Sequence, residues 1–411
     1  MTIANQLPRA SLSTGLTRSP IICFSHLRWD FVLQRPQHLM QRYSKDRKVF
    51  YFEEYIPTDH HLAYLEIHSF AGTTVKSIRP RIPHWWKEAD RDAGLARLLD
   101  EVIDLNGEAR PIMWFYTPLM YGFAKHVDAA AIVYDCMDEL ANFRFASPLL
   151  KDAEQSLMKG ADVVFTGGLS LYDAKKNRHP NVHVFPSSVD IGHFRAGRSG
   201  NLQEPADQAA IAGHRLGYYG VIDERLDLDL IRSVASSRPD FSLIFLGPVV
   251  KISPEDLPRA PNIHYLGLKA YADLPAYLSG WNAALMPFAL NDATRYISPT
   301  KTPEYLASGR PVVSTRVTDV VRSYSGVEGV FLADGTTEFI AACDAAIDLT
   351  KGDDGWIENV DILLGCSSWD KTFENMSEIV ASATRSDEGR NVPVIHALIG
   401  VMDDAISARS V

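Results

Sequence analysis

Short apolar runs alternate with segments of helical spacing along most of the chain, and this alternation constrains the fold more than any other feature. The runs in the first half fall at 21–25, 49–53, 112–116, 131–135, 163–166 and 182–186. Those in the second half fall at 215–219, 242–246, 263–266, 283–287, 311–314 and 329–332. Strands that alternate with helices form parallel sheets. The sequence therefore predicts an α/β fold with two doubly wound parallel sheets in tandem.

A polar stretch at 192–207, which contains several glycine and proline residues, interrupts this pattern. We therefore expect one domain at 19–195 and a second at 196–385. Residues 1–18 contain no continuous apolar run, so they predict a disordered or frayed tail rather than a secretory signal. The periodic segment near the end of the chain predicts a helix within 386–411.

The amino-acid composition, net charge and cysteine spacing exclude several classes of protein. A chain of 411 residues with 46% hydrophobic and 22% charged residues is ordinary for a soluble globular protein, which excludes disorder and coiled coil as its main state. The net charge of −10 argues against a general nucleic-acid binder, because phosphate contacts need a basic face. The four cysteines are far apart and form no C-x-x-C pair, so they encode neither a disulfide framework nor a structural zinc site.

The most informative segment is 298–314, where a loop with two hydroxyls and a lysine leads into a short predicted helix that Gly309 would end. Free amides at the helix start, together with Thr300 and the Lys301 ammonium, would receive a diphosphate. Glu304, one turn further, could accept hydrogen bonds from two ribose hydroxyls. Spacing alone leaves open a plain capped helix with a surface lysine.

This segment resembles the nucleotide-sugar motif of GT-B glycosyltransferases, above all the retaining family 4 type, and Glu304 aligns with the second glutamate of that motif. The resemblance extends through 217–220, 245–248, 262–267, 274–278 and 283–287. It implies a GT-B fold, in which two Rossmann-like domains face a cleft. It also implies a hexosyltransferase that moves a sugar, with retention, from a UDP- or GDP-sugar to a glycan or lipid-linked acceptor. Bacterial exopolysaccharide or envelope glycan synthesis would be the pathway.

The resemblance places the donor in the second domain and the acceptor in the first, with the C-terminal helix packing back on the first domain. The turns after the strands at 242–246 and 263–266 would meet the nucleobase. The donor-binding residues that it implies are Gly220, Arg225, Gly247, Leu268, Lys269, Ser298, Thr300, Lys301 and Glu304. Two positions depart from the family pattern: Tyr296 replaces the first glutamate, and only Arg225 remains of the usual Arg and Lys after the first strand of the domain.

The loop after the first strand, 25–38, holds an unusual density of charged and titratable groups. By the resemblance, this is where the acceptor meets the donor sugar. We expect catalytic roles for His26 and Arg35. The acceptor-binding residues that we expect are Arg28, Trp29, Asp30 and His38.

Asp135 and Asp138 follow the strand at 131–135 and therefore lie at its carboxyl end. A carboxylate there could take a proton from an acceptor hydroxyl. We expect Asp135 to be the stronger catalytic candidate, and with Asp135 as base the reaction would invert the anomeric configuration. Asp138 is a second catalytic candidate, unless it only caps a helix.

Two Asp-x-Asp sequences, 90–92 and 227–229, spell the motif with which GT-A glycosyltransferases hold a metal. Both have helical contexts, in which residues i and i+2 point to different faces, so we expect no metal or other cofactor.

Residues 76–87 combine cations with tryptophans, a mixture found both at membrane interfaces and in packed surface loops. The residues that would contact a membrane are Arg79, Arg81, Trp85, Trp86 and Lys87. No apolar run is long enough to span a bilayer, so we expect a cytoplasmic protein whose only contact with the membrane would be peripheral, at its inner face.

Two other function classes remain open. A nucleotide-sugar epimerase would act on the donor without a second substrate. A non-catalytic nucleotide-sugar sensor would bind without turnover, and the tyrosine at position 296 keeps this alternative open. A Rossmann dehydrogenase is disfavoured because no G-x-G-x-x-G fingerprint follows the first strand of either domain.

Overall fold

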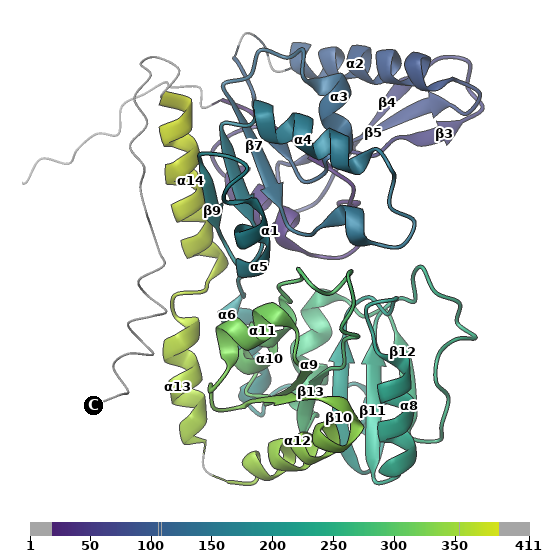
Figure 1. Ribbon diagram of the computed structural model, residues 1–411, viewed down its shortest axis with the longest axis vertical. Coiled ribbons are helices and arrows are strands. Elements are labelled where there is room, and N and C mark those ends of the chain that lie inside the picture. The colour runs from purple at the N-terminus through teal and green to yellow at the C-terminus, as the bar shows by residue number, and fades with distance from the viewer. Residues whose placement is uncertain (1–18, 106, 108, 353, 386–411) are drawn as a thin grey trace, which may run out of the picture.

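The computed structural model describes residues 19–105, 107, 109–352 and 354–385. It contains two sheets, one above the other in Figure 1, each built around parallel strands. The N-terminal sheet has nine strands and the C-terminal sheet has six. The predicted α/β fold with two doubly wound sheets is therefore confirmed.

The N-terminal sheet runs in the order β3-β5-β2-β1-β6-β7-β8-β9, and β4 pairs antiparallel with β5 at its edge. Its strands are β1 (Ile21–Ser25), β2 (Val49–Glu53), β3 (Ile56–Thr58), β4 (Tyr64–Ser69), β5 (Lys76–Pro83), β6 (Ile112–Phe115), β7 (Ala131–Cys136), β8 (Val163–Thr166) and β9 (Val182–Val184). Its helices are α1 (Arg35–Tyr43), α2 (Glu88–Asp104), α3 (Tyr121–Ala124), α4 (Leu150–Gly160) and α5 (Leu169–Lys175).

The C-terminal sheet runs in the order β12-β11-β10-β13-β14-β15. Its strands are β10 (His214–Tyr219), β11 (Phe241–Leu246), β12 (Ile263–Gly267), β13 (Ala283–Met286), β14 (Val312–Thr315) and β15 (Val330–Ala333). The helices from this half of the chain are α6 (Ile191–Arg195), α7 (Ala206–Ala209), α8 (Leu228–Ser237), α9 (Leu274–Ser279), α10 (Lys301–Ala307), α11 (Thr318–Tyr324), α12 (Gly335–Leu349), α13 (Gly355–Leu364) and α14 (Trp369–Arg385).

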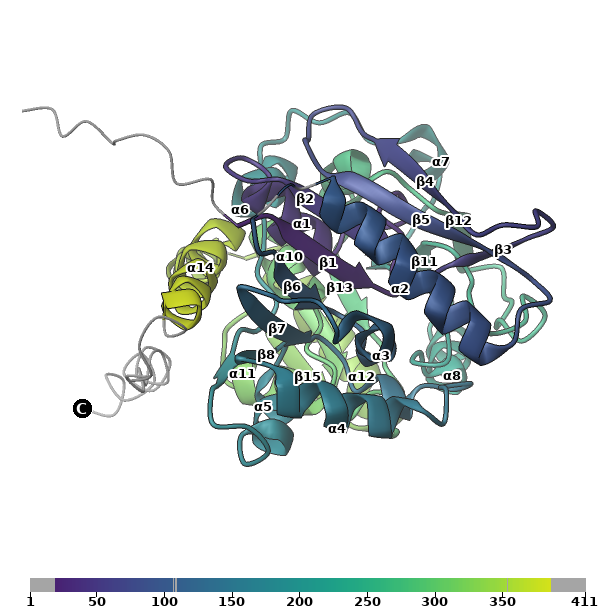
Figure 2. The ribbon, with the colours of Figure 1, turned by 90° about the horizontal axis from the view of Figure 1, so that it is seen from above.

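Both faces of the N-terminal sheet are buried, which explains why its central strands are continuously apolar. In β1, Ile22 and Phe24 join a core cluster with residues of α2, α3 and α4. Ile21 and Cys23 point to the opposite face, where residues of α1 and α14 cover the sheet. Helix α14 lies along the side of this domain in Figures 1 and 2. The last described helix therefore belongs to the N-terminal core although it follows the C-terminal sheet in the chain.

The structure moves the predicted domain limits. Val189 and Phe194 are fully buried in the C-terminal core, so the chain enters the second domain after β9 and not at residue 195. It returns to the first domain with α14, inside the segment 196–385 that we assigned to the second domain. The predicted tail 1–18 and the predicted returning helix within 386–411 lie outside the described residues.

The edge of the N-terminal sheet was not predicted. The segment 76–87 begins as β5, which pairs with three strands and is not a loop on the surface. Arg79 pairs with Asp30 and Glu53, and Arg81 pairs with Glu66, so both guanidinium groups are neutralised within the fold. Strands β3 and β5 contain proline at positions 57, 80 and 83, and proline usually interrupts a strand except at an edge, so the sequence did not predict them.

Candidate active site

A cavity of about 530 Å³ lies between the two domains. Its walls come from loops that follow parallel strands of both sheets, which is where ligands bind in α/β folds. The N-terminal wall includes residues after β1, β7 and β8, and the C-terminal wall includes residues after β10, β11 and β12 together with the start of α10. The two sheets therefore present their carboxyl ends to one shared space.

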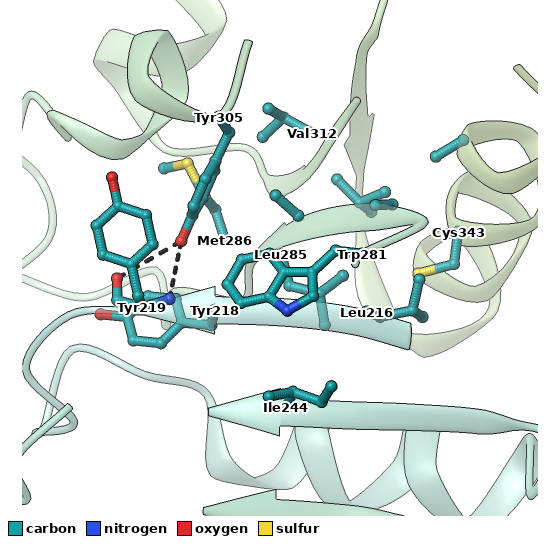
Figure 3. Close-up of a cluster of buried hydrophobic side chains, with 14 of the residues drawn as sticks. Leu216, Tyr218, Tyr219, Ile244, Trp281, Leu285, Met286, Tyr305, Val312 and Cys343 are labelled. Carbon is teal, nitrogen blue, oxygen red and sulfur yellow. Dashed lines mark hydrogen bonds between the residues drawn. The ribbon is translucent and has the colours of Figure 1, made fainter. Parts of the chain in front are cut away.

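Helix α10 is fixed to the end of β10 by a buried aromatic cluster (Figure 3). The Tyr219 amide donates a hydrogen bond to Tyr305 Oη at 3.0 Å, and the Tyr305 ring packs edge-on against Trp281. Gly217 makes room for that indole, because a Cβ there would lie 2.1 Å from Trp281. The start of α10 is thus held rigidly against the cavity.

Lys301, the first residue of α10, lines the cavity beside a turn that only glycine permits. Gly220 has φ +138°, and a Cβ there would lie 2.3 Å from Lys301 Cε. The half-buried ammonium forms no ion pair or hydrogen bond with another described residue, and burial lowers its pKa. Its nearest ring is that of Tyr218, with Nζ 6.0 Å from the centroid. This is a cation positioned to receive an anion.

Glu304 lies one turn into the helix, also in the cavity wall, and is only 7% exposed. Burial raises the pKa of its carboxyl to about 7, although the hydrogen bond that Tyr219 Oη donates to Oε2 and the charge of Lys301 both lower that pKa. Glu304 can therefore change its protonation state near neutral pH.

Other predicted donor residues line the same wall, but their side chains differ in availability. Gly247 has φ +146°, and a Cβ there would lie 1.9 Å from the Gly220 carbonyl oxygen, so two glycine turns stack at this point. Arg225 is held by Asp223, with Nε 2.9 Å from Oδ1. The Lys269 ammonium is occupied by Asp207 at 2.6 Å. Leu268, Ser298 and Thr300 also line the cavity.

The two aspartates after β7 have different environments, and these reverse our preference between them. Asp135 is fully buried outside the cavity wall, and both of its oxygens accept from Arg35 Nε, at 3.0 and 3.1 Å. Arg35 also donates to the Phe185 carbonyl at 2.7 Å. This pair ties α1 to β7 and leaves Asp135 no access to an acceptor. Asp138 lines the cavity, and burial raises the pKa of its carboxyl.

The predicted acceptor residues anchor their loop instead of lining the cavity. The buried Glu53 accepts from the Trp29 amide and from Arg28 Nη1, both at 3.0 Å, and Asp30 pairs with Arg79. His38 is buried, where its ring stacks on Trp369 with centroids 4.6 Å apart. His26 is half-buried and is not part of the cavity lining, and burial and the charge of Lys251 lower its pKa to about 4. The charged loop pattern thus marks an anchored loop.

Several cavity residues carried no signal in the sequence. The acceptor loop reaches the cavity through the apolar stretch at 31–33 and Gln34, together with the predicted catalytic residue Arg35. Tyr271 lines the opposite wall, and its hydroxyl has no partner among the described residues. Only their position next to a charged motif could have indicated them.

The described residues contain no group of three or more histidine, cysteine, aspartate or glutamate side chains that could hold a metal ion. At 227–229, Asp227 caps α8 by accepting from the Leu230 amide at 2.8 Å, and Asp229 pairs with Arg232. Each of these carboxylates therefore has a local role. Within the described part of the chain, no helix has the length and apolarity that crossing a membrane requires.

Known proteins resemble this chain in sequence and in fold. No family model matches the chain. The chain is 26% identical over 308 residues to the putative teichuronic acid biosynthesis glycosyltransferase TuaH of Bacillus subtilis, a match that covers 69% of this chain and 75% of the relative.

Among solved structures, sucrose-phosphate synthase of Thermosynechococcus elongatus matches with a TM-score of 0.63 and 14% identity, over 90% of this chain and 100% of that one. HepE of Anabaena, in complex with UDP and glucose, matches with a TM-score of 0.65 and 13% identity, over 88% and 99%. The trehalose-6-phosphate protein of E. coli, bound with UDP-2-fluoro glucose, matches with a TM-score of 0.63 and 12% identity, over 88% and 99%. The predicted GT-B fold is confirmed.

Proposed function

We propose that this chain, a glycosyltransferase with the GT-B fold, transfers a sugar from a UDP-sugar to a glycan or lipid-linked acceptor. The observation that carries the proposal is Lys301, a half-buried ammonium without a carboxylate partner among the described residues, facing the interdomain cavity beside Glu304. A desolvated cation of this kind raises the free energy of the empty site, and a diphosphate would supply the missing charge. Uridine is favoured because HepE and the E. coli protein were each solved with a uridine nucleotide.

Different residues would bind the diphosphate, the ribose and the base of the donor. Lys301, Thr300 and Arg225 would bind the diphosphate, and Glu304 would accept hydrogen bonds from the ribose. The Gly220 amide already donates to the Leu246 carbonyl at 2.8 Å, so Gly220 contributes only the close approach of its turn. The turns at Gly247 and at Leu268–Lys269 would approach the base with their backbones. In Lys269 the main chain has this role, because the ammonium is already paired with Asp207.

For the reaction itself we propose retention, which the resemblance of the Glu304 segment to a retaining family supports. The leaving phosphate oxygen would take the proton of the acceptor hydroxyl, while Lys301 stabilises the charge that develops on the diphosphate. Asp138 would orient the acceptor. Its raised pKa also suits a general base, so an inverting reaction through Asp138 is the second candidate.

The acceptor would bind on the N-terminal side of the cavity. We propose that the reaction belongs to the synthesis of a bacterial envelope polysaccharide, which the name of the TuaH relative supports. We propose that no metal takes part. Peripheral contact with the inner face of the membrane would use the exposed Trp85 and Lys87, since Arg79 and Arg81 are paired within the fold.

Calorimetry with UDP, GDP and ADP tests the donor. UDP should bind tightest, and equal or absent binding of all three would refute the assignment. NMR of the linkage formed from a UDP-α-sugar tests the stereochemistry, since an α-linked product means retention and a β-linked product means inversion. Release of UDP that continues in excess EDTA would support metal-free transfer.

A further inference from the structure

A loop of the N-terminal domain crosses to the C-terminal domain through residues 142–145, which we call the strap. Asn142 Nδ2 donates a hydrogen bond to the Asp292 carbonyl at 3.2 Å. The Arg144 amide donates to Glu224 Oε1 at 3.0 Å. The strap is therefore anchored to the second domain on both sides of Phe143.

The Phe143 ring lies against two cations of the C-terminal domain. The Arg225 guanidinium carbon lies 5.9 Å from the ring centroid, and Lys251 Nζ lies 5.1 Å from it. Arg225 is itself restrained, because Asp223 accepts from both its Nε and its Nη2. Cations at these distances are attracted to the face of an aromatic ring. The strap thus reaches the donor wall of the cavity through Phe143.

The backbone around this contact is strained. Phe145 and Lys251, with φ of 64° and 65°, are the non-glycine residues with a left-handed backbone in the described part of the chain. Bulky side chains disfavour this conformation, which persists only where the surroundings enforce it and is concentrated at functional sites. Both residues flank Phe143, one on the strap and one on the facing loop.

The same segment carries Asp138. A single 3₁₀ turn, Leu140–Asn142, connects the residues after β7 to the strap and includes the first strap residue. At the near end, Glu139 pairs with Lys175 of the N-terminal domain at 2.6 Å. The segment from Asp138 to Phe143 is therefore held by one domain near its start and by the other at its end, so the position of Asp138 depends on contacts with both domains.

We propose that Phe143 is a positioning residue through which the occupied donor site fixes Asp138 on the acceptor side. This rests on the proposed function, in which Arg225 binds the donor diphosphate. A diphosphate that engages Arg225 adds a second anionic contact to a guanidinium that Asp223 already restrains, Arg225 and Lys251 hold the Phe143 ring, and the short turn joins that ring to Asp138.

Hydrogen exchange of the full-length protein with and without UDP tests the coupling directly. In the wild type, UDP should slow exchange of the amides at 138–145 about fivefold, the order of change that a stacked cation brings to a local opening equilibrium. Phe143→Leu should lose this protection and keep its affinity for UDP by calorimetry. Phe145→Leu, the same substitution at an exposed ring of the strap, is the matched control and should behave as the wild type.

Turnover of a UDP-sugar gives a second measurement. Phe143→Leu should lower kcat about tenfold with little change in the KM for the donor, and Phe143→Tyr should restore it, because the ring is what matters. Binding of UDP without protection of 138–145, or protection that survives in Phe143→Leu, would overturn this inference alone. Failure of the wild type to bind UDP would overturn the proposed function and this inference with it.

Discussion

Replacing Lys301 with alanine separates a ligand-binding cation from a structural one. The ammonium has no ion pair or hydrogen bond with another described residue, so its removal deletes only its weak attraction to the Tyr218 ring and to Glu304. The midpoint of unfolding should stay unchanged or rise, because a partly desolvated charge disappears. Nucleotide binding should lose a charged hydrogen bond of about 1.5–3 kcal/mol, which is roughly a 10- to 150-fold increase in the Kd for UDP.

Calorimetry with UDP and thermal unfolding of the empty protein measure the two effects. Lys269→Ala is the matched control, since this lysine also lines the cavity but its ammonium is occupied by Asp207. Its Kd for UDP should change by less than about threefold. Equal affinities of the two variants for UDP, or a large loss of stability in Lys301→Ala, would refute the reasoning.

Three further predictions follow from the same contacts. Because burial raises the pKa of Glu304 to about 7, the ribose-binding carboxylate forms only above that pH. The affinity for UDP should therefore rise between about pH 6 and about pH 8, and less so in Glu304→Gln, since UDP's own titration is common to both proteins; identical pH curves would contradict this. Asp138→Asn should lower kcat at least tenfold, or roughly 1.4 kcal/mol, without loss of stability. Asp135→Asn should instead lower the free energy of unfolding in urea by about 3 kcal/mol, because it leaves Arg35 buried and unpaired. A loss of kcat in Asp135→Asn with an unchanged kcat in Asp138→Asn would restore Asp135 as the base. Gly247→Ala should displace the Gly220 turn and weaken UDP binding at least tenfold by calorimetry, and wild-type affinity would show that the turn does not approach the donor.

The fold could be predicted wherever strands are buried on both faces. The expected runs at 21–25, 49–53 and 163–166 match β1, β2 and β8 residue for residue. The edge strands could not be predicted, because β3 and β5 contain proline and their pairing depends on a distant partner. The return of α14 to the first domain likewise depends on packing that no local pattern encodes.

The candidate site could be predicted in part. Lys301 and Glu304 line the cavity as expected, because a loop-to-helix motif after a strand constrains where its side chains lie. Among the acceptor-loop charges, sequence spacing could not separate residues that face the ligand from residues that anchor the loop. The buried Glu53, which accepts from Arg28 and the Trp29 amide, makes this difference, and it lies on another strand.

The central claim is that the start of α10 binds the diphosphate of a nucleotide sugar. A crystal structure of the protein with UDP measures this directly. We expect the diphosphate within hydrogen-bonding distance of Lys301 Nζ, beside the Gly220 turn, with the ribose at Glu304. Density for UDP at any other place, with the Lys301 ammonium left without a phosphate, would contradict the claim.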